Sequence, residues 1–219
     1  MLTQFDTELY PNDCEVVEML SHNQFVYLIQ KNGSSSLRRE VRDNNLKVYT
    51  NEEISKLDTV DVYIRNQQKR YISGVNTYVQ FLQRDHPELD TNTCLWFATR
   101  YNFLNRHYLP QFLWLVNLSR FIKPTAQIRL RKFENLANIT KHNKDAGITK
   151  PDNQFVQRIL HNATNNDMQL WWFVDQMLED LNGTSLTFQQ IVKHIQSNPS
   201  GVYNNFTQRF NEIAKTLLS

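Results

Sequence analysis

The chain has 219 residues, which is enough for one domain with a sizeable core and short for two. Hydrophobic residues make up 40% of it and include 13 Phe, 9 Tyr and 4 Trp, so an intrinsically disordered chain is excluded. The net charge of +2 is too balanced for a broad nucleic-acid-binding surface, but a local anion site is compatible with it.

Residues 1–24 are mixed and polar, and we expect an irregular lead-in there. The first residues have neither the basic nor the apolar region of a signal peptide, and no stretch is apolar enough to span a membrane. The sequence therefore predicts a cytoplasmic protein without a membrane or nucleic-acid partner.

Cys14 and Cys94 form neither a disulfide framework nor a zinc site, so we expect two unpaired, mostly buried thiols.

Residues 25–29 form a continuous apolar run, which predicts a buried strand of a parallel sheet. The run ends at Lys31 and Gly33, and residues 34–36 are serines that provide N-cap chemistry for a helix beginning near Leu37. Glycine is scarce in this chain, with 5 in all, and Gly33 allows a tight turn and a close approach of the backbone to a ligand.

This first loop has the chemistry of an anion site. Backbone N–H groups and a helix N-terminus form a positive concavity, Lys31 adds a charge, and the serines add hydroxyl donors. The loop lacks both the Walker spacing and the G-x-G-x-x-G pattern. The alternative is an ordinary turn between a strand and a helix.

A second unit of the same kind follows. Residues 60–64 predict a strand, and residues 67–82 carry apolar side chains at helical spacing. Arg65 lies at the strand end and Ser73 on the second helical turn, so both are expected to reach one phosphate, while Lys69 and Arg70 can equally belong to a solvated helix face. Ligands of open α/β sheets bind beyond the carboxyl ends of the strands, so two such loops suit a ligand with two separated phosphates.

The rest of the sequence predicts two more strands and several helices. Asp90 caps a helix, residues 112–116 and 128–130 predict strands, and residues 141–153 predict a loop. Gly183 occupies a helix C-cap, and helices are expected at 153–163, 165–181, 186–196 and 202–218. The prediction is a single α/β domain over residues 1–219, a parallel sheet flanked by helices with a helix-rich C-terminal third.

Two segments resemble the donor-binding elements of the sulfotransferases. Residues 25–37, with Lys-Asn-Gly-Ser-Ser-Ser-Leu, resemble the family's K-x-G-[ST]-[ST]-[ST]-L loop, which binds the 5′-phosphosulfate of 3′-phosphoadenylyl sulfate (PAPS). Residues 62–74 resemble the R-[DN]-P-x-x-R-x-x-S-x-Y element, which binds the 3′-phosphate through its first Arg and its Ser. Two positions depart from that element: Gln67 replaces the usual Pro, and Gly74 follows the Ser.

Three further segments are similar to the carbohydrate-directed branch of that family. Residues 106–111 resemble its H-[WFY]-x-P-Q element, residues 132–136 its E-[ND]-L segment, and residues 142–144 an H-x-N-K loop. The resemblance implies a P-loop-like, sulfotransferase-type fold with a donor-binding part over about 25–150 and a helical part over about 151–219. It also implies PAPS as donor, adenosine 3′,5′-bisphosphate as product, and a small-molecule or glycan acceptor.

The resemblance also implies roles for single residues. Lys31 would stabilise charge on the leaving phosphate oxygen, without a metal. The base that accepts the hydroxyl proton would be His107 or one of two acids, Glu52 and Glu53; the alternatives are a structural histidine and helix N-terminal acids after Thr50. The residues that would bind the donor are Lys31, Asn32, Gly33, Ser34, Ser35, Ser36, Arg65, Ser73 and Lys144.

The predicted function is transfer of a sulfuryl group from PAPS to an acceptor hydroxyl, most readily that of a carbohydrate. One alternative is a nucleotide or nucleoside kinase with a degenerate phosphate loop, which needs an Asp for Mg²⁺ at a strand end, whereas Asp61 lies inside a predicted strand. Another is a non-enzymatic interaction protein of a virus or phage, which the Asn-rich, Gly-poor composition suits. Trp171 and Trp172 are expected either to pack in the core or to form a platform for a sugar ring. Glu134 is expected to make a structural contact.

Overall fold

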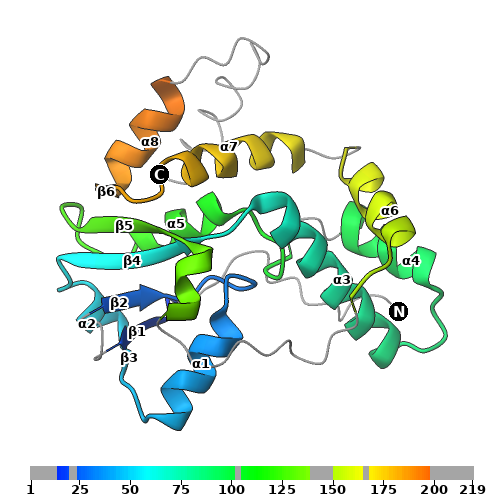
Figure 1. The fold of residues 1–219 in the computed structure, drawn as a ribbon, viewed down its shortest axis with the longest axis horizontal. Helices are drawn as coiled ribbons and strands as arrows, with labels where there is room; N and C mark the ends of the chain where they lie inside the picture. Colours follow the sequence, from blue (N-terminus) through cyan, green and yellow to red (C-terminus); the bar gives the residue numbers. More distant parts are fainter. Residues whose placement is uncertain (1–13, 20–23, 102–104, 139–149, 165–167, 198–219) are drawn as a thin grey trace.

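The computed structural model describes residues 14–19, 24–101, 105–138, 150–164 and 168–197. It is an α/β structure in which helices flank a mixed sheet with the strand order β3-β1-β2-β4-β5-β6 (Figure 1). The strands are β1 (Val16–Met19), β2 (Gln24–Tyr27), β3 (Val48–Tyr49), β4 (Thr59–Ile64), β5 (Gln127–Lys132) and β6 (Ser185–Leu186).

Helices connect most of these strands and form most of the described part of the C-terminal third. The α-helices are α1 (Ser34–Asp43), α2 (Asn51–Ile54), α3 (Gln67–Asp85), α4 (Thr91–Trp96), α5 (Gln111–Ser119), α6 (Asn153–Thr164), α7 (Met168–Asp180) and α8 (Phe188–Ser197). A π-helical segment, η2 (Phe97–Tyr101), and a 3₁₀ segment, η3 (Phe133–Asn138), complete the described elements. In the described part of the chain, no helix combines the length and the apolarity that a membrane crossing requires.

The central strands β2, β4 and β5 are parallel, and the outer strands pair antiparallel, so the predicted parallel pairing is confirmed for the central strands and the sheet as a whole is mixed. The strands predicted around residues 25–29, 60–64 and 128–130 are confirmed. The expectation of an irregular lead-in is wrong for Val16–Met19, because β1 forms a hairpin with β2 and buries Val16, Val17 and Met19. Glu18 interrupts this short apolar run, so the sequence pattern did not indicate a strand here.

The strand predicted at residues 112–116 is also wrong, because this segment lies inside helix α5. Gln111 to Leu118 are all buried, so the helix has no polar face and its sequence shows no helical period. Its N-terminus is held from another helix: the Asp175 carboxylate on α7 accepts hydrogen bonds from the backbone N–H groups of Gln111 (2.7 Å) and Phe112 (2.9 Å). A cap this distant in sequence leaves no local signal.

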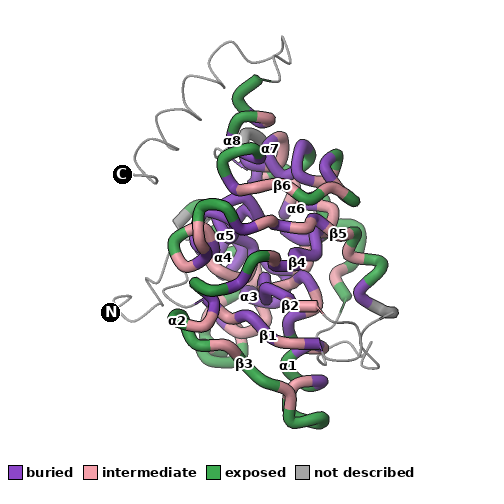
Figure 2. Tube along the Cα trace, turned by 90° about the vertical axis from the view of Figure 1, so that its left-hand side faces the viewer, coloured by how far each residue is buried: buried purple, intermediate pink, exposed green. Residues whose placement is uncertain are grey.

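Alternate strand residues supply two apolar layers on the two faces of the sheet. Val60, Val62 and Ile64 of β4 belong to the larger core, which contains residues of α3, α5, α7 and α8. On the other face Tyr63 packs in a smaller cluster with residues of α1 and η3. Figure 2 shows burial concentrated in the central strands and in the helices over the larger core, with α2 and the far end of α1 exposed.

The predicted C-terminal helices correspond to α6, α7 and α8 and are confirmed over their described residues. The helix expected at 202–218 and most of the loop expected at 141–153 lie outside the described residues. Gly183 has a φ of +90° in the turn between α7 and β6, three residues past the helix end rather than at its cap. Cys14 and Cys94 are unpaired and buried, as predicted.

Candidate functional site: two loops at the carboxyl edge of the sheet

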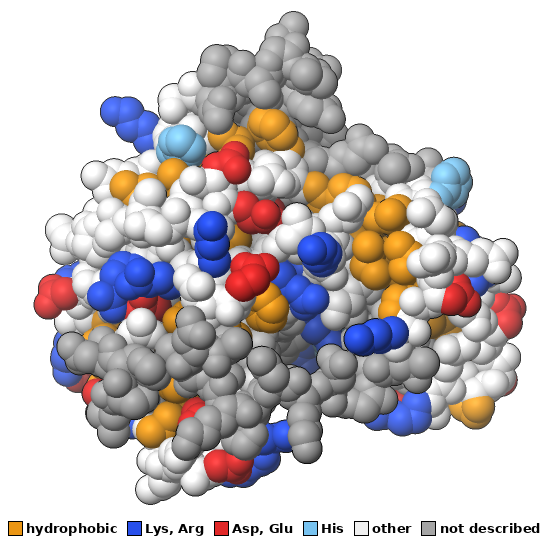
Figure 3. Space-filling model, viewed as in Figure 1, with side chains coloured by type: hydrophobic (Ala, Val, Ile, Leu, Met, Phe, Trp, Pro, Cys, Tyr) orange, Lys and Arg blue, Asp and Glu red, His pale blue; other side chains and the backbone are white. Residues whose placement is uncertain are grey.

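The turns that follow β2 and β4 lie side by side because these two strands are parallel neighbours. Arg65, just after β4, donates from Nη1 to the carbonyl oxygen of Lys31 (2.9 Å). Arg70 on α3 donates to the carbonyl oxygen of Gln30 from Nη2 (3.0 Å) and Nε (3.2 Å). The structure thus brings the two sequence-predicted loops together, and basic side chains gather near the middle of this face (Figure 3).

The first loop has an unusual backbone. Lys31 and Gly33 have φ values of +64° and +78°, so two residues of the turn adopt the left-handed region. A Cβ at Gly33 would lie 2.0 Å from Leu136 Cδ2, so η3 closes against this turn. The N-cap of α1 is Gly33, with no side-chain cap; the expectation that the serines cap this helix is wrong, because Ser34 already belongs to its first turn.

A cleft of about 210 Å³ opens between this turn, the start of α1 and one side of α3. No side chain of the described residues caps the first amides of α1, so this positive helix end is available to an anion in the cleft. The lining residues are Gln30, Lys31, Gly33, Ser34, Ser35, Arg38, Thr77, Phe81 and His107.

Lys31 is one of two cations in the described lining of the cleft, the other being Arg38. Its Nζ donates a hydrogen bond to Thr77 Oγ1 (2.7 Å), which ties the loop to α3. Burial, followed by the positive charges of Arg65 and Arg70, lowers the pKa of Lys31 to about 8. A partly desolvated ammonium with few neighbouring anions interacts strongly with an incoming negative group.

His107 faces the same cleft in a single defined tautomer. Asn105 Oδ1 accepts the backbone N–H of His107 (3.0 Å), so this atom is an acceptor, and it lies 2.7 Å from His107 Nδ1. Nδ1 therefore carries the proton and Nε2 carries a lone pair. Burial and then the charges of Lys31, Arg106 and Arg70 lower the pKa of His107 to about 4, which keeps the ring neutral at pH 7.

A buried amide, Gln111, joins the two loops beneath the cleft. Its Oε1 accepts from Asn32 Nδ2 (2.6 Å) and from the backbone N–H of Arg65 (2.9 Å), and its Nε2 donates to the Arg65 carbonyl (2.8 Å). Asn32 Nδ2 also donates to the Tyr63 carbonyl (2.7 Å), at the end of β4. One side chain at the start of α5 therefore fixes the separation of the two loops.

Several predicted donor-binding residues do not line the cleft. The Arg65 guanidinium lies over the Phe133 ring, 5.0 Å from its centroid, and is part of the wall between the loops. Ser73 lies one turn before Thr77, whose hydroxyl donates to the Ser73 carbonyl (2.9 Å). The lining also lacks Ser36 and the buried Asn32. Lys144 lies outside the described residues.

The structure does not bring Glu52 and Glu53 to the cleft. Glu53 forms a capping box with Thr50 at the start of α2 and an ion pair with Lys47 (2.6 Å), and these contacts lower its pKa to about 2. Glu52 pairs with Lys56 at the surface (2.8 Å). Both acids serve the short helix, in agreement with the alternative interpretation of this pair.

The candidate magnesium ligand of a kinase is also engaged elsewhere. Asp61 is fully buried inside β4, and its carboxylate pairs with Arg129 and Arg131 on the neighbouring strand. Trp171 is buried in the core, and Trp172 packs edge-on against Tyr71 with ring centroids 5.6 Å apart, so these rings support packing rather than a sugar platform. Glu134 is exposed.

Sequence reasoning missed four lining residues and the burial of Arg70. Thr77 and Phe81 follow Ser73 at helical spacing, so extending that face along α3 would have found them. Arg70 is fully buried rather than solvated, because its guanidinium also donates to the Leu109 carbonyl (2.5 Å). Gln30 and Arg38 carried no signal beyond proximity to Lys31.

Comparison of the chain with protein-family models, with curated proteins and with solved structures gave no match.

Proposed function

We propose that this chain is a sulfotransferase that moves a sulfuryl group from PAPS to an acceptor hydroxyl, most readily of a carbohydrate, on a P-loop-like, sulfotransferase-type fold. The observation that carries the proposal is the meeting of Lys31 and His107 in one cleft at the start of α1. A cation for a leaving oxygen and a neutral imidazole for a hydroxyl proton are the two groups that this transfer needs.

The residues of the cleft fit the phosphosulfate end of the donor. The uncapped first turn of α1, the hydroxyls of Ser34 and Ser35, and the close-packed turn at Gly33 suit a tetrahedral anion. When bound, PAPS supplies the sulfuryl group and an anionic leaving phosphate. Lys31 would hold that phosphate oxygen, and Arg65 would add positive charge from behind the loop, where it also holds the Lys31 carbonyl.

His107 is the proposed base, in place of Glu52 and Glu53. Its Nε2 is unprotonated because Asn105 fixes the other nitrogen as the donor. A low pKa makes the ring a weak base in the ground state, but the ring is fully in its neutral form at pH 7. The proton would move from the acceptor hydroxyl to Nε2 as negative charge builds on the phosphate beside Lys31.

Ligand titration followed by thermal unfolding tests the donor. Adenosine 3′,5′-bisphosphate should raise the melting temperature by mass action, and ATP with Mg²⁺ should raise it much less. Lys31→Ala should abolish both the shift and the transfer, and Arg65→Ala should weaken the shift. Lys193→Ala, on the exposed side of α8, is the matched control and should behave like the natural chain.

Two outcomes would sink the proposal. The first is the absence of any shift with the bisphosphate. The second is an equal shift with ATP and Mg²⁺, which would favour a nucleotide kinase even though Asp61 is engaged with two arginines. A bisphosphate shift that survives Lys31→Ala would place the donor site elsewhere in the molecule.

A further inference from the structure

A second cleft lies on another side of α3. It has a volume of about 390 Å³, within the range of about 300–1,000 Å³ that is typical of small-molecule sites. Helix α3 contributes Thr77 and Phe81 to the first cleft, whereas Val79 and Gln83 turn toward the second. The lining residues of the second cleft are Asn76, Val79, Gln80, Gln83, Thr91, Lys150, Pro151, Asp152, Phe155 and Arg158.

The uncharged part of this lining matches a hydroxylated ring. It contains three side-chain amides and the Thr91 hydroxyl, and each of these groups can both donate and accept, as sugar hydroxyls do. Gln83 Nε2 donates to Thr91 Oγ1 (2.8 Å), which holds α3 to the start of α4. Val79 and Pro151 provide an apolar wall suited to the C–H face of a sugar ring.

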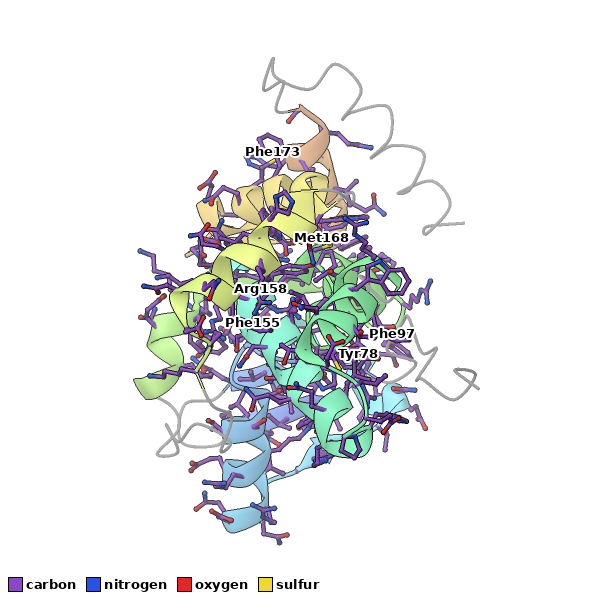
Figure 4. All side chains as sticks on the ribbon, turned by 90° about the vertical axis from the view of Figure 1, so that its right-hand side faces the viewer. Tyr78, Phe97, Phe155, Arg158, Met168 and Phe173 are labelled. Carbon is purple, nitrogen blue, oxygen red and sulfur yellow. The ribbon has the colours of Figure 1, made fainter. Side chains whose placement is uncertain are left out.

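The charged part of the lining is positive. Arg158 lies beside Phe155 (Figure 4), with its guanidinium 5.3 Å from the ring centroid and Nη1 donating to Asn92 Oδ1 (2.5 Å). The buried Arg158 Nε has no hydrogen-bond partner within the part of the chain that the structure describes. Lys150 is exposed. Among the described residues of the lining, Asp152 is the only acid, and it accepts the backbone N–H of Phe155 (2.7 Å) at the start of α6.

We propose that this second cleft binds a sugar acid, a hydroxylated ring that carries a carboxylate. Lys150 and Arg158 bind the carboxylate, the amides of α3 bind the ring hydroxyls, and the apolar wall contacts the ring face. The described lining has two cations and one acid, and that acid is already hydrogen-bonded to the backbone. The cleft should therefore bind a sugar with a carboxylate more tightly than a neutral sugar. The inference does not depend on sulfuryl transfer, because none of these residues lines the cleft of Lys31.

Calorimetric titration of the full chain with D-glucuronate and with D-glucose tests the site. Glucuronate should bind, and glucose should bind at least about tenfold more weakly because it lacks the charged group. Arg158→Gln and Lys150→Gln should each weaken glucuronate binding by about tenfold. Lys31→Ala should leave it unchanged, and Lys193→Gln is the matched charge control on α8.

Four results would overturn the inference: no binding of glucuronate, equal binding of glucose, full binding by both the Arg158 and Lys150 variants, or loss of binding in Lys31→Ala. The last result would assign the ligand to the first cleft. Lys150 is exposed, so its variant keeps the test decisive if Arg158→Gln does not fold. The absence of glucuronate binding would not affect the result expected from the bisphosphate titration. The absence of a bisphosphate shift would likewise not affect the result expected with glucuronate.

Discussion

Burial and the positive charges of nearby side chains oppose the protonation of the His107 imidazole. Asn105 offers an acceptor to Nδ1, the rings of Tyr78 and Phe81 lie within about 6 Å, and the nearby charges are positive. A histidine in such surroundings stays neutral and keeps one nitrogen for proton transfer.

Asn105→Asp should raise the pKa of His107 above its present value of about 4, because a carboxylate at the same position stabilises the imidazolium. Nitrogen-15 NMR of the ring should show protonated Nδ1 and bare Nε2 in the natural chain at pH 7. The opposite tautomer in that spectrum would remove His107 from the role of base. Asn92→Asp, at the surface of α4, controls for an added charge.

The rate of transfer should depend on pH through two groups of the free protein. His107 must be neutral, so kcat/KM should fall as pH drops through about 4. Lys31 must be charged, so kcat/KM should also fall as pH rises through about 8. A plateau that extends to pH 10 would contradict the assignment of Lys31. Arg65→Ala removes a repulsive charge and should move the upper limb to higher pH.

At the scale of the elements, Gly74 sets how closely α3 approaches the segment that carries His107. A Cβ at this position would lie 2.5 Å from the His107 carbonyl oxygen and 2.7 Å from Tyr108 Cβ. That segment is held in place, since Tyr108 donates its hydroxyl hydrogen to the Ala98 carbonyl (2.7 Å) and Arg70 binds the Leu109 carbonyl. The presence of glycine at position 74 therefore has a packing reason.

Gly74→Ala should lower the free energy of unfolding by about 2 kcal/mol, because overpacking against a fixed backbone outweighs the better helix propensity of alanine. Urea unfolding measures this loss. Ser73→Ala, one residue earlier on the same helix, should change stability by less than about 0.5 kcal/mol. Equal stability of the two variants would show that the backbone around His107 can shift at little cost to accommodate the added Cβ.

Sequence patterns predicted the elements with a clear local signal and missed those defined by distant partners. The runs before Lys31 and Arg65 gave β2 and β4, and their parallel pairing made the meeting of the two loops predictable. Helix α5 was missed because it is buried all around and capped from Asp175. The role of Gln111 between the loops depends on contacts with residues 46 and 79 positions away, which no local pattern encodes.

At the scale of the whole molecule, the charge of Lys31 lowers the free energy of unfolding, although the proposed reaction needs that charge. Folding removes this ammonium from water and places it near Arg65 and Arg70, which is why its pKa falls from 10.5 to about 8. Between these two values the unfolded chain binds more protons than the folded one, so stability rises with pH there. The penalty is therefore complete below pH 8 and disappears above about pH 10.5.

Lys31→Met should abolish transfer and raise the free energy of unfolding at pH 7 by about 1 kcal/mol, since it removes a poorly solvated charge and keeps the aliphatic chain. Urea unfolding at pH 7 and near pH 10 measures the effect, and the advantage should shrink at the higher pH. Lys193→Met, at an exposed position, should show neither change. A less stable Lys31→Met would mean that the bond to Thr77 outweighs the charge penalty.

The guanidinium groups of Arg65 and Arg70 bind the carbonyl oxygens of Lys31 and Gln30, so contacts within the chain itself hold this turn. They fix two consecutive peptide planes of the turn, so the loop has already lost its conformational freedom when the chain folds. An anion then meets a rigid receptor, and the entropy of ordering the loop is absent from its binding free energy. Nitrogen-15 relaxation at residues 31–33 should accordingly report a rigid backbone in the free protein and change little when the anion binds.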